Sequence, residues 1–346
     1  MTTSKANIAN EPPIGNKQKV RIAYGAGGAL AGLMAEGKEK FDWIVDDTPG
    51  YAGQKILGCE IRPSEDLLTL PADSAQIVVC AQTTTASRAI SRRLEGMGFC
   101  KGVNFCDCSD YTVQQMNNKI ERFVGNPFEE NILDQVKLAI EEISLRNLSG
   151  IAGTWLFTGL LETLRREGIP GSIAEAGVYQ GANAIAALRC SPTLRERTYY
   201  LMDSFEGLRN ISTLDPNSRE GEFSDVNDAN IKILREAIAP YPNANICKGY
   251  FEETLPGLSD QSFALAYIDC DLAEPARFCM DWFWDRLTDG GFLLIHDYWF
   301  PDFKMPAGTP EPFRGIKAVA DQFLTDKLAR FVVFPETTHL LIRKEN

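Results

Sequence analysis

The sequence has no apolar run that approaches the ~20 residues of a membrane-spanning helix. Its nine cysteines lack paired spacing, which is typical of reduced thiols in a cytoplasmic protein and not of a disulfide framework. It has only two histidines, His296 and His339. These absences favour a cytoplasmic protein with no membrane segment, in which any imidazole chemistry depends on one of two side chains.

The sequence also lacks a basic excess, because 35 Lys and Arg stand against 47 Asp and Glu for a net charge of −12. The imbalance is confined to residues 125–346, whereas residues 1–124 carry equal numbers of acidic and basic side chains. Nucleic acids and anionic membranes bind basic surfaces, so neither is an expected partner. A bound divalent cation would offset part of the acidic excess.

The first third of the chain predicts a small α/β unit. Residues 1–17 are polar and predict a disordered leader. Apolar runs at 20–24, 41–45 and 77–81, separated by glycine-rich and helical segments, predict parallel strands. We therefore expect a Rossmann-like domain of the nucleotide-binding type at residues 18–111.

The remaining chain predicts a helical connection and a second α/β domain. Residues 112–168 carry apolar side chains near helical spacing, and residues 169–346 alternate apolar runs with helix-length segments. Such runs are typical of parallel strands buried on both faces. The expected strands, of which the last two form a hairpin, are 172–177, 199–203, 244–247, 263–271, 291–297, 330–334 and 339–342.

Acidic residues follow four of these runs. Glu175, Asp203, the pair Asp269 and Asp271, and Asp297 stand where the runs end. In parallel sheets, ligands bind outside the carboxyl ends of the strands. Carboxylates removed from water together indicate a functional site, so the sequence predicts that these acids meet in one crevice.

A glycine-rich turn follows the first of these strands. Residues 175–181 read Glu-Ala-Gly-Val-Tyr-Gln-Gly, and Asp203 ends the next strand. Glycines allow backbone to approach a ligand at a helix N-terminus, and a later carboxylate can bind a ribose diol. A plain strand-to-helix turn accounts equally well for this pattern alone.

Five motifs in fixed order resemble the macrocin O-methyltransferase family, over roughly residues 150–343. They are Glu-Ala-Gly-Val-Tyr-Gln-Gly at 175–181, Asp-Ser-Phe-Glu-Gly-Leu at 203–208, Gly-Tyr-Phe-Glu-Glu-Thr-Leu-Pro at 249–256, Asp-Cys-Asp-Leu-Ala-Glu at 269–274 and His-Asp-Tyr at 296–298. The family methylates sugar hydroxyls of natural products with S-adenosylmethionine. The resemblance implies its seven-stranded sheet with a terminal antiparallel hairpin, and possible homo-oligomers.

The resemblance also implies which residues bind the cofactor. Glu175 and Gly177 would line its amino-acid and ribose end, Asp203 would bind the ribose hydroxyls, and residues 249–251 would lie near the adenine. The complete expected set is Glu175, Gly177, Tyr179, Gly181, Asp203, Ser204, Phe205, Gly249, Tyr250, Phe251 and Asp269.

In the same family, acids of two motifs hold magnesium and a third acid is the candidate general base. These positions map to Asp269 and Asp297 for the metal and to Asp271 for the base. A sugar hydroxyl is a poor nucleophile near neutral pH. A cation, either Mg²⁺ or Mn²⁺, would stabilise the developing alkoxide, and a carboxylate would take its proton.

His296 stands where the family has the first acid of Asp-Asp-Tyr. Magnesium prefers oxygen ligands, whereas imidazole suits manganese, iron or zinc. His296 is therefore a ligand of a softer metal, the general base, or a structural residue at a strand end. His339 lies in the expected hairpin and is interpreted as structural. Residues 273–275 read Ala-Glu-Pro instead of the family's Tyr-Glu-Ser, which puts acceptor contacts in question.

The first domain carries a weaker signal. Gly-Ala-Gly-Gly-Ala at 25–29, with Asp46 and Asp47, resembles small nucleotide-binding domains of sugar-modifying proteins. Gly25 and Gly27 would face phosphate there, although a purely structural Rossmann unit explains the pattern equally well.

The leading hypothesis is a metal-assisted O-methyltransferase for a glycosylated or polyhydroxylated small molecule. The alternatives are a non-catalytic cofactor-binding regulator or scaffold, and a nicotinamide-dependent sugar-modifying enzyme run by the first domain. Two long loops, at 210–228 and 299–314, are expected to cover substrate, or to pack on the sheet or a subunit contact.

Overall fold

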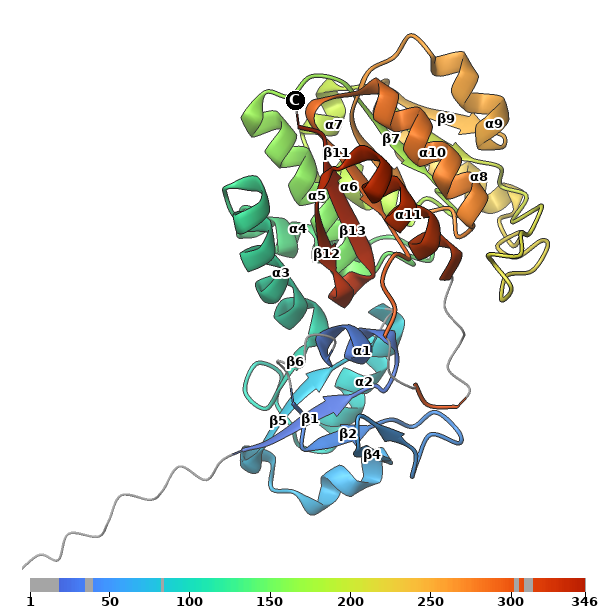
Figure 1. Cartoon of the computed structure of the whole chain (residues 1–346). Coiled ribbons are helices and arrows are strands. Elements are labelled where there is room, and N and C mark those ends of the chain that lie inside the picture. Colours follow the sequence, from blue (N-terminus) through green and yellow to red (C-terminus); the bar gives the residue numbers. More distant parts are fainter. Residues whose placement is uncertain (1–18, 35–39, 82–83, 302–304, 308–313, 346) are drawn as a thin grey trace, which may run out of the picture.

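A computed structural model describes residues 19–34, 40–81, 84–301, 305–307 and 314–345. The predicted leader and parts of the 299–314 loop lie outside these residues. The described part contains two sheets, of which the second stands above the first in Figure 1. No helix among the described residues is long and apolar enough to cross a bilayer.

The first sheet has six strands in the order β3-β4-β2-β1-β5-β6. Its strands are β1 (Val20–Tyr24), β2 (Trp43–Val45), β3 (Lys55–Ile56), β4 (Cys59–Arg62), β5 (Ala75–Val79) and β6 (Phe105–Asp107). All neighbours pair in parallel except the β3–β4 hairpin. The sequence prediction missed this hairpin and β6, because strands of two to four residues carry too little periodicity to be recognised.

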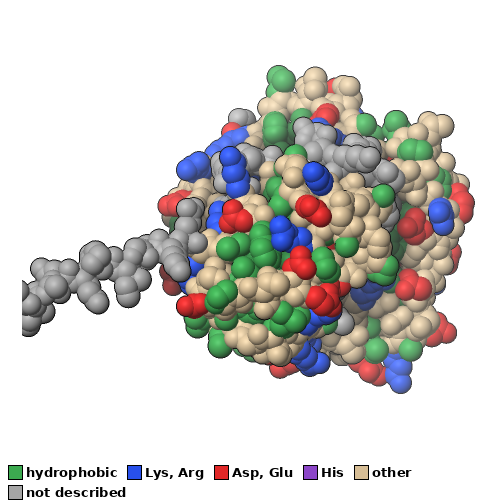
Figure 2. Space-filling view, turned by 90° about the horizontal axis from the view of Figure 1, so that it is seen from below, with side chains coloured by type: hydrophobic (Ala, Val, Ile, Leu, Met, Phe, Trp, Pro, Cys, Tyr) green, Lys and Arg blue, Asp and Glu red, His purple; other side chains and the backbone are tan. Residues whose placement is uncertain are grey.

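Helices accompany the first sheet. Seen from below, this end of the molecule carries interspersed acidic and basic side chains (Figure 2). The helices are α1 (Gly28–Met34), α2 (Thr84–Gly96), and the 3₁₀ segments η1 (Ser64–Thr69) and η2 (Ala72–Ser74). The mixture of charges agrees with the charge balance of residues 1–124.

Three helices connect the sheets: α3 (Cys108–Val124), α4 (Asn131–Glu141) and α5 (Gly150–Glu167). The expected helical character of 112–168 is confirmed, although α3 begins at Cys108. Gly168 adopts the left-handed conformation at φ +67° and ends α5, as a helix C-cap commonly does. The division into domains at 18–111, 112–168 and 169–346 stays a prediction.

The second sheet has seven strands in the order β12-β13-β11-β10-β7-β8-β9. They are β7 (Ser172–Ala176), β8 (Tyr199–Asp203), β9 (Ala244–Lys248), β10 (Phe263–Ile268), β11 (Leu287–Ile295), β12 (Arg330–Phe334) and β13 (His339–Arg343). The first five are parallel, and β12 and β13 form an antiparallel hairpin beside β11. The predicted α/β class, with a Rossmann-like first sheet and this seven-stranded second sheet, is confirmed.

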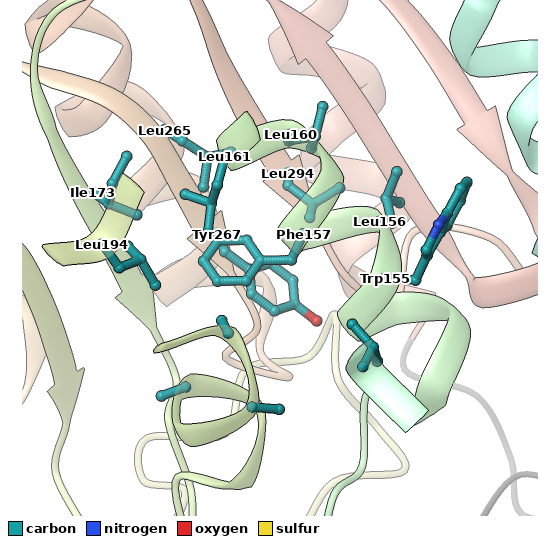
Figure 3. Packing of buried hydrophobic residues seen from close by; sticks show 14 of the residues in the cluster. Trp155, Leu156, Phe157, Leu160, Leu161, Ile173, Leu194, Leu265, Tyr267 and Leu294 are labelled. Atoms are coloured by element: carbon teal, nitrogen blue, oxygen red, sulfur yellow. The ribbon is translucent and has the colours of Figure 1, made fainter. Parts of the chain in front are cut away.

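Helices cover both faces of the second sheet (Figure 1). Its helices are α6 (Ala182–Cys190), α7 (Thr193–Glu196), α8 (Asp228–Ile238), α9 (Phe251–Thr254), α10 (Ala273–Arg286) and α11 (Arg314–Lys327), with the 3₁₀ segments η3 (Leu255–Leu258) and η4 (Pro335–Thr337). Alternate strand residues face opposite layers, so Leu265 packs toward α5 while Ala266 packs toward α10. Figure 3 shows the α5 layer, where Phe157 and Leu161 lie against strand residues.

The two sheets meet where α1 packs on η4. A Cβ at Gly32 would lie 2.6 Å from the carbonyl oxygen of Pro335, so only glycine allows this approach of the two backbones. Lys119 and Glu336 form a mostly buried ion pair at 2.9 Å nearby. These contacts hold the first sheet close to the turn that leads into β13.

Candidate active site

The carboxyl ends of five adjacent parallel strands lie at one edge of the second sheet. Ile268 at the end of β10 pairs with Ala176 of β7 on one side and with Ile295 of β11 on the other. This register places Gly177, Asp269 and His296 next to one another. The topology therefore brings the strand-end acids together at one edge, as the sequence predicted.

A cavity of about 500 Å³ opens at this edge. Twelve of the fourteen predicted site residues line it: Glu175, Gly177, Tyr179, Asp203, Ser204, Gly249, Tyr250, Phe251, Asp269, Asp271, His296 and Asp297. Gly181 and Phe205 are not among the lining residues. Gly181, at φ +90°, precedes α6 and packs against Leu234, and the Phe205 side chain is buried in the core.

Asp203 is held by backbone amides. Its Oδ2 accepts hydrogen bonds from Val178 and Tyr179, both at 2.8 Å, and its Oδ1 accepts one from Phe205 at 2.6 Å. Phe205 therefore contributes its backbone N–H rather than its ring. Burial raises the pKa of Asp203 although these amides favour the ionised form. Oδ1 keeps a lone pair that a ligand hydroxyl can use.

Glu175 lies on the floor of the cavity and is 2% exposed. It accepts a hydrogen bond from the Asn183 amide at 3.2 Å and another from the Tyr199 hydroxyl. Burial raises the pKa of Glu175 to about 7, with a further contribution from Asp269, while these two hydrogen bonds oppose the rise. Ionisation of Glu175 above neutral pH therefore lowers the stability of the folded chain.

Glu175→Gln is expected to stabilise the fold more at pH 8 than at pH 5. The carboxyl ionises near pH 7 when folded and near 4.5 when unfolded, so the folded state binds more protons between these values and stability falls as pH rises. The difference is worth about 3 kcal/mol at pH 8. Gln keeps the shape without the charge: its oxygen can still accept from Asn183, and its amide can donate to the Tyr199 oxygen. Urea unfolding of both proteins at pH 5 and pH 8 measures the effect.

Glu162→Gln is the matched control. Burial opposes ionisation of Glu162, but hydrogen bonds from Ser191, Arg165 and Thr193 lower its pKa. Its stabilisation is lost only as pH falls below about 4.5, so its mutational effect should be constant between pH 5 and pH 8. An equal effect of Glu175→Gln at both pH values would contradict the account of the buried carboxyl.

Asp269, His296 and Asp297 form a compact group of potential metal ligands, with ligand atoms that all lie within 4.8 Å of one another. His296 Nδ1 is 2.9 Å from Asp269 Oδ1 and 3.4 Å from Asp297 Oδ1. Burial opposes a charged imidazole, but the two carboxylates outweigh it and hold the pKa of His296 well above its usual value. The structure brings His296 close to both predicted metal-binding acids. Whether it is a metal ligand, the general base or a structural residue stays a prediction.

The backbone is strained at these positions. Asp271 and Asp297 have φ values of +62° and +56°, a conformation uncommon for residues other than glycine. Tyr179, Asn210 and Phe223, which also line the cavity, share it. Strain of this kind persists only where the surroundings enforce it, and it gathers at functional sites. Burial, Asp297 and Asp269 together raise the pKa of Asp271 well above its usual value.

Other lining residues were not predicted from the sequence. Arg146, Leu148 and Ser149 precede α5, and Glu274, Pro275 and Phe278 lie on α10. Phe278 is 39% exposed, whereas phenyl side chains are usually buried. Arg209 stacks over the Tyr250 ring and pairs with Glu252 at 2.6 Å. The sequence signal for this part of the cavity was the departure from the family's pattern at residues 273–275.

In the first domain, the residues predicted to face a nucleotide make their contacts with other groups of the protein. Asp46 accepts hydrogen bonds from the amides of Ala26 at 2.6 Å and Thr48 at 2.7 Å. Asp47 accepts them from the Tyr24 hydroxyl, the Ser64 amide and Arg93. A Cβ at Gly25 would lie 2.3 Å from the Cys80 carbonyl oxygen, so this glycine serves close packing. Nucleotide binding by this domain stays a prediction.

The macrocin-O-methyltransferase family matches residues 153–322. The match spans 170 residues, just under half of the chain, and over these residues it supports the resemblance found in the sequence. The matched region includes the five parallel strands whose ends surround the cavity, and it ends before β12 and β13.

Two relatives carry names of sugar methyltransferases. The 8-demethyl-8-(2,3-dimethoxy-alpha-L-rhamnosyl)-tetracenomycin-C 4'-O-methyltransferase of Streptomyces olivaceus is 30% identical over 149 residues, 40% of this chain and 57% of that protein. The mycinamicin III 3''-O-methyltransferase of Micromonospora griseorubida is 27% identical over 153 residues, 41% of this chain and 60% of that protein. The chain thus spans about three fifths of these relatives.

Solved structures are more distant. The O-methyltransferase NovP has a TM-score of 0.48 and 17% identity over 69% of this chain and all of that chain. The calicheamicin methyltransferase CalS11 has a TM-score of 0.44 and 19% identity over 62% of this chain and 91% of that chain.

Proposed function

We propose that this protein transfers a methyl group from S-adenosylmethionine to a hydroxyl of a sugar or polyhydroxylated natural product, with a divalent cation at Asp269, His296 and Asp297. The observation that carries the proposal is the group of three metal-ligand side chains within 4.8 Å, at the edge of a cavity of about 500 Å³. The match to the family and the names of the relatives support the reaction type.

The donor end of the cavity suits S-adenosylmethionine. Asp203 Oδ1 retains acceptor capacity for a ribose hydroxyl, Tyr250 and Phe251 offer ring surfaces for a purine, and Glu175 offers a negative charge near the amino-acid end. Bound S-adenosylmethionine would supply an electrophilic methyl group on a sulfonium. The chain's contribution is to hold the two reactants in line, which accounts for much of the rate enhancement of such a displacement.

The donor set of the proposed cation site is two carboxylates and one imidazole. The 2.9 and 3.4 Å separations of the His296 nitrogen from the two carboxylate oxygens are close to the ~3 Å between neighbouring ligand atoms of a six-coordinate ion with ~2.1 Å bonds. An imidazole in this set favours manganese, iron or zinc over magnesium. When bound, the cation would stabilise negative charge on an acceptor oxygen.

Asp271 is the proposed proton acceptor. Within the described residues, no side chain or backbone group donates a hydrogen bond to its carboxylate, and it lines the cavity beside the cation ligands. Phe278 and Pro275 on α10 also line the cavity and would contact an apolar part of the acceptor. Asp271 would therefore meet an acceptor hydroxyl held between the cation and α10.

The metal preference tests the role of His296. Apo protein should bind Mn²⁺ more tightly than Mg²⁺, and His296→Asp, which restores the family's acid, should shift the ratio of the two affinities roughly tenfold toward Mg²⁺. Calorimetric titration with each metal alone measures both affinities without an acceptor. An unchanged ratio would contradict the ligand role, and no metal binding by the native protein would contradict cation assistance.

A further inference from the structure

A buried polar chain lies directly behind the proposed cation site. The Tyr267 hydroxyl on β10 is 3.2 Å from Asp269 Oδ2, 3.1 Å from His339 Nε2 on β13 and 3.2 Å from Ser149 Oγ. Tyr267 and His339 are 1% and 0% exposed. Figure 3 shows the Tyr267 ring among the aliphatic side chains around α5, with its hydroxyl at the edge of that cluster.

The directions of these hydrogen bonds follow from the groups present. An ionised carboxylate can only accept, so the Tyr267 hydroxyl donates its single proton to Asp269 Oδ2. With the imidazole proton assigned to Nε2, the hydroxyl oxygen accepts from His339 and from Ser149. Ser149 and His339 thus converge on the Tyr267 hydroxyl, which in turn bonds to one oxygen of Asp269.

This polar chain leaves one oxygen of Asp269 available to the proposed cation. Oδ2 is occupied by Tyr267, while Oδ1 is the oxygen 2.9 Å from His296 Nδ1. Rotation of the carboxylate would break the Tyr267 bond. The His339 ring also packs against the His296 ring, with centroids 4.7 Å apart, so the same histidine supports a second ligand.

Packing alone does not explain these polar side chains. A buried hydroxyl or imidazole costs free energy unless it is hydrogen-bonded, and an apolar pair of similar shape can be as stable or more so. Room is also kept for the imidazole, because a Cβ at Gly153 would lie 3.2 Å from His339 Cε1. The polar chain therefore needs a reason other than core filling.

We propose that Tyr267 and His339 are positioning residues that orient Asp269 and His296 for a divalent cation. The inference rests on the proposed function, and it assigns a site role to His339, which the sequence analysis interpreted as structural. Partners that orient metal ligands typically change metal affinity 10- to 100-fold when they are removed.

Calorimetric titration with Mn²⁺ alone tests the proposal. Tyr267→Phe should bind Mn²⁺ about 10- to 100-fold more weakly, while its urea midpoint and its S-adenosylmethionine affinity stay near native values. Tyr200→Phe is the matched control: it removes a hydroxyl from β8, two strands away from β10, where the ring packs against Phe263 and does not line the cavity. It should leave Mn²⁺ affinity unchanged.

Substitutions at His339 separate positioning from packing. His339→Gln keeps a donor near the Nε2 position and should retain most of the Mn²⁺ affinity, whereas His339→Leu should lose as much as Tyr267→Phe. Native Mn²⁺ affinity in Tyr267→Phe or folded His339→Leu would overturn the positioning role and leave the proposed function standing. No Mn²⁺ binding by the native protein would overturn the cation part of the proposed function, and the positioning role with it.

Discussion

Asp271→Asn is expected to lower the rate of methyl transfer by about 10²- to 10⁴-fold, the usual contribution of a general base. Asn has nearly the same shape as Asp and tolerates the φ of +62° found here, but it cannot accept a proton. Removing one of three neighbouring carboxylates also relieves repulsion with Asp269 and Asp297. The free energy of unfolding should therefore stay at or above its native value.

Transfer of labelled methyl groups to a panel of glycosylated compounds would identify an acceptor and then measure this rate. Asp260→Asn is the matched control, because Asp260 is exposed and precedes the opposite end of the same strand, β10. S-adenosylmethionine affinity should be native in both variants. Less than a tenfold loss in Asp271→Asn would assign proton removal to another group, with His296 as the next candidate.

Gly177→Ala is expected to abolish cofactor and cation binding together. Gly177 has φ +99°, and a Cβ there would lie 1.7 Å from the carbonyl oxygen and 2.5 Å from the carbonyl carbon of Asp269. The backbones after β7 and β10 are tied here by the Asp269 amide, which donates to Ala176 at 2.8 Å. The methyl group can be accommodated only by moving the backbone of Asp269, which displaces a proposed cation ligand.

The same substitution should lower the free energy of unfolding by more than ~3 kcal/mol, because it combines a backbone clash with an unfavourable φ. Gly257→Ala is its control, since a Cβ at Gly257 meets nothing within 4 Å and the residue has no positive φ. Urea unfolding measures the stability, and calorimetry with S-adenosylmethionine and Mn²⁺ measures binding. Native stability in Gly177→Ala would contradict the close contact of these two strand ends.

The sequence predicted the second sheet well because each central strand is a continuous apolar run. The acid or glycine that follows each run then marks the same edge of the sheet, so the gathering of Glu175, Asp203 and Asp269 follows from parallel topology alone. Strand limits were less certain: β11 begins at Leu287, four residues before the apolar run, because its first residues include Asp289 and Gly290.

The polar chain behind the site could not be predicted in the same way. Ser149, Tyr267 and His339 are more than 70 residues apart, and they meet because β13 inserts beside β11 with Leu340 opposite Ile295. Local patterns contain no signal for such a register between a hairpin and a parallel strand. The positive φ values at Asp271 and Asp297 likewise arise from tertiary contacts, since nothing in those residue types demands them.

Calorimetric titration of the metal-stripped protein with S-adenosylmethionine, and in parallel with NAD, tests the central claim most directly. We expect saturable micromolar binding of S-adenosylmethionine at one site, weakened in Asp203→Ala, and no binding of NAD. Absence of S-adenosylmethionine binding with and without Mn²⁺ or Mg²⁺ would contradict the methyltransferase assignment and direct attention to the first domain.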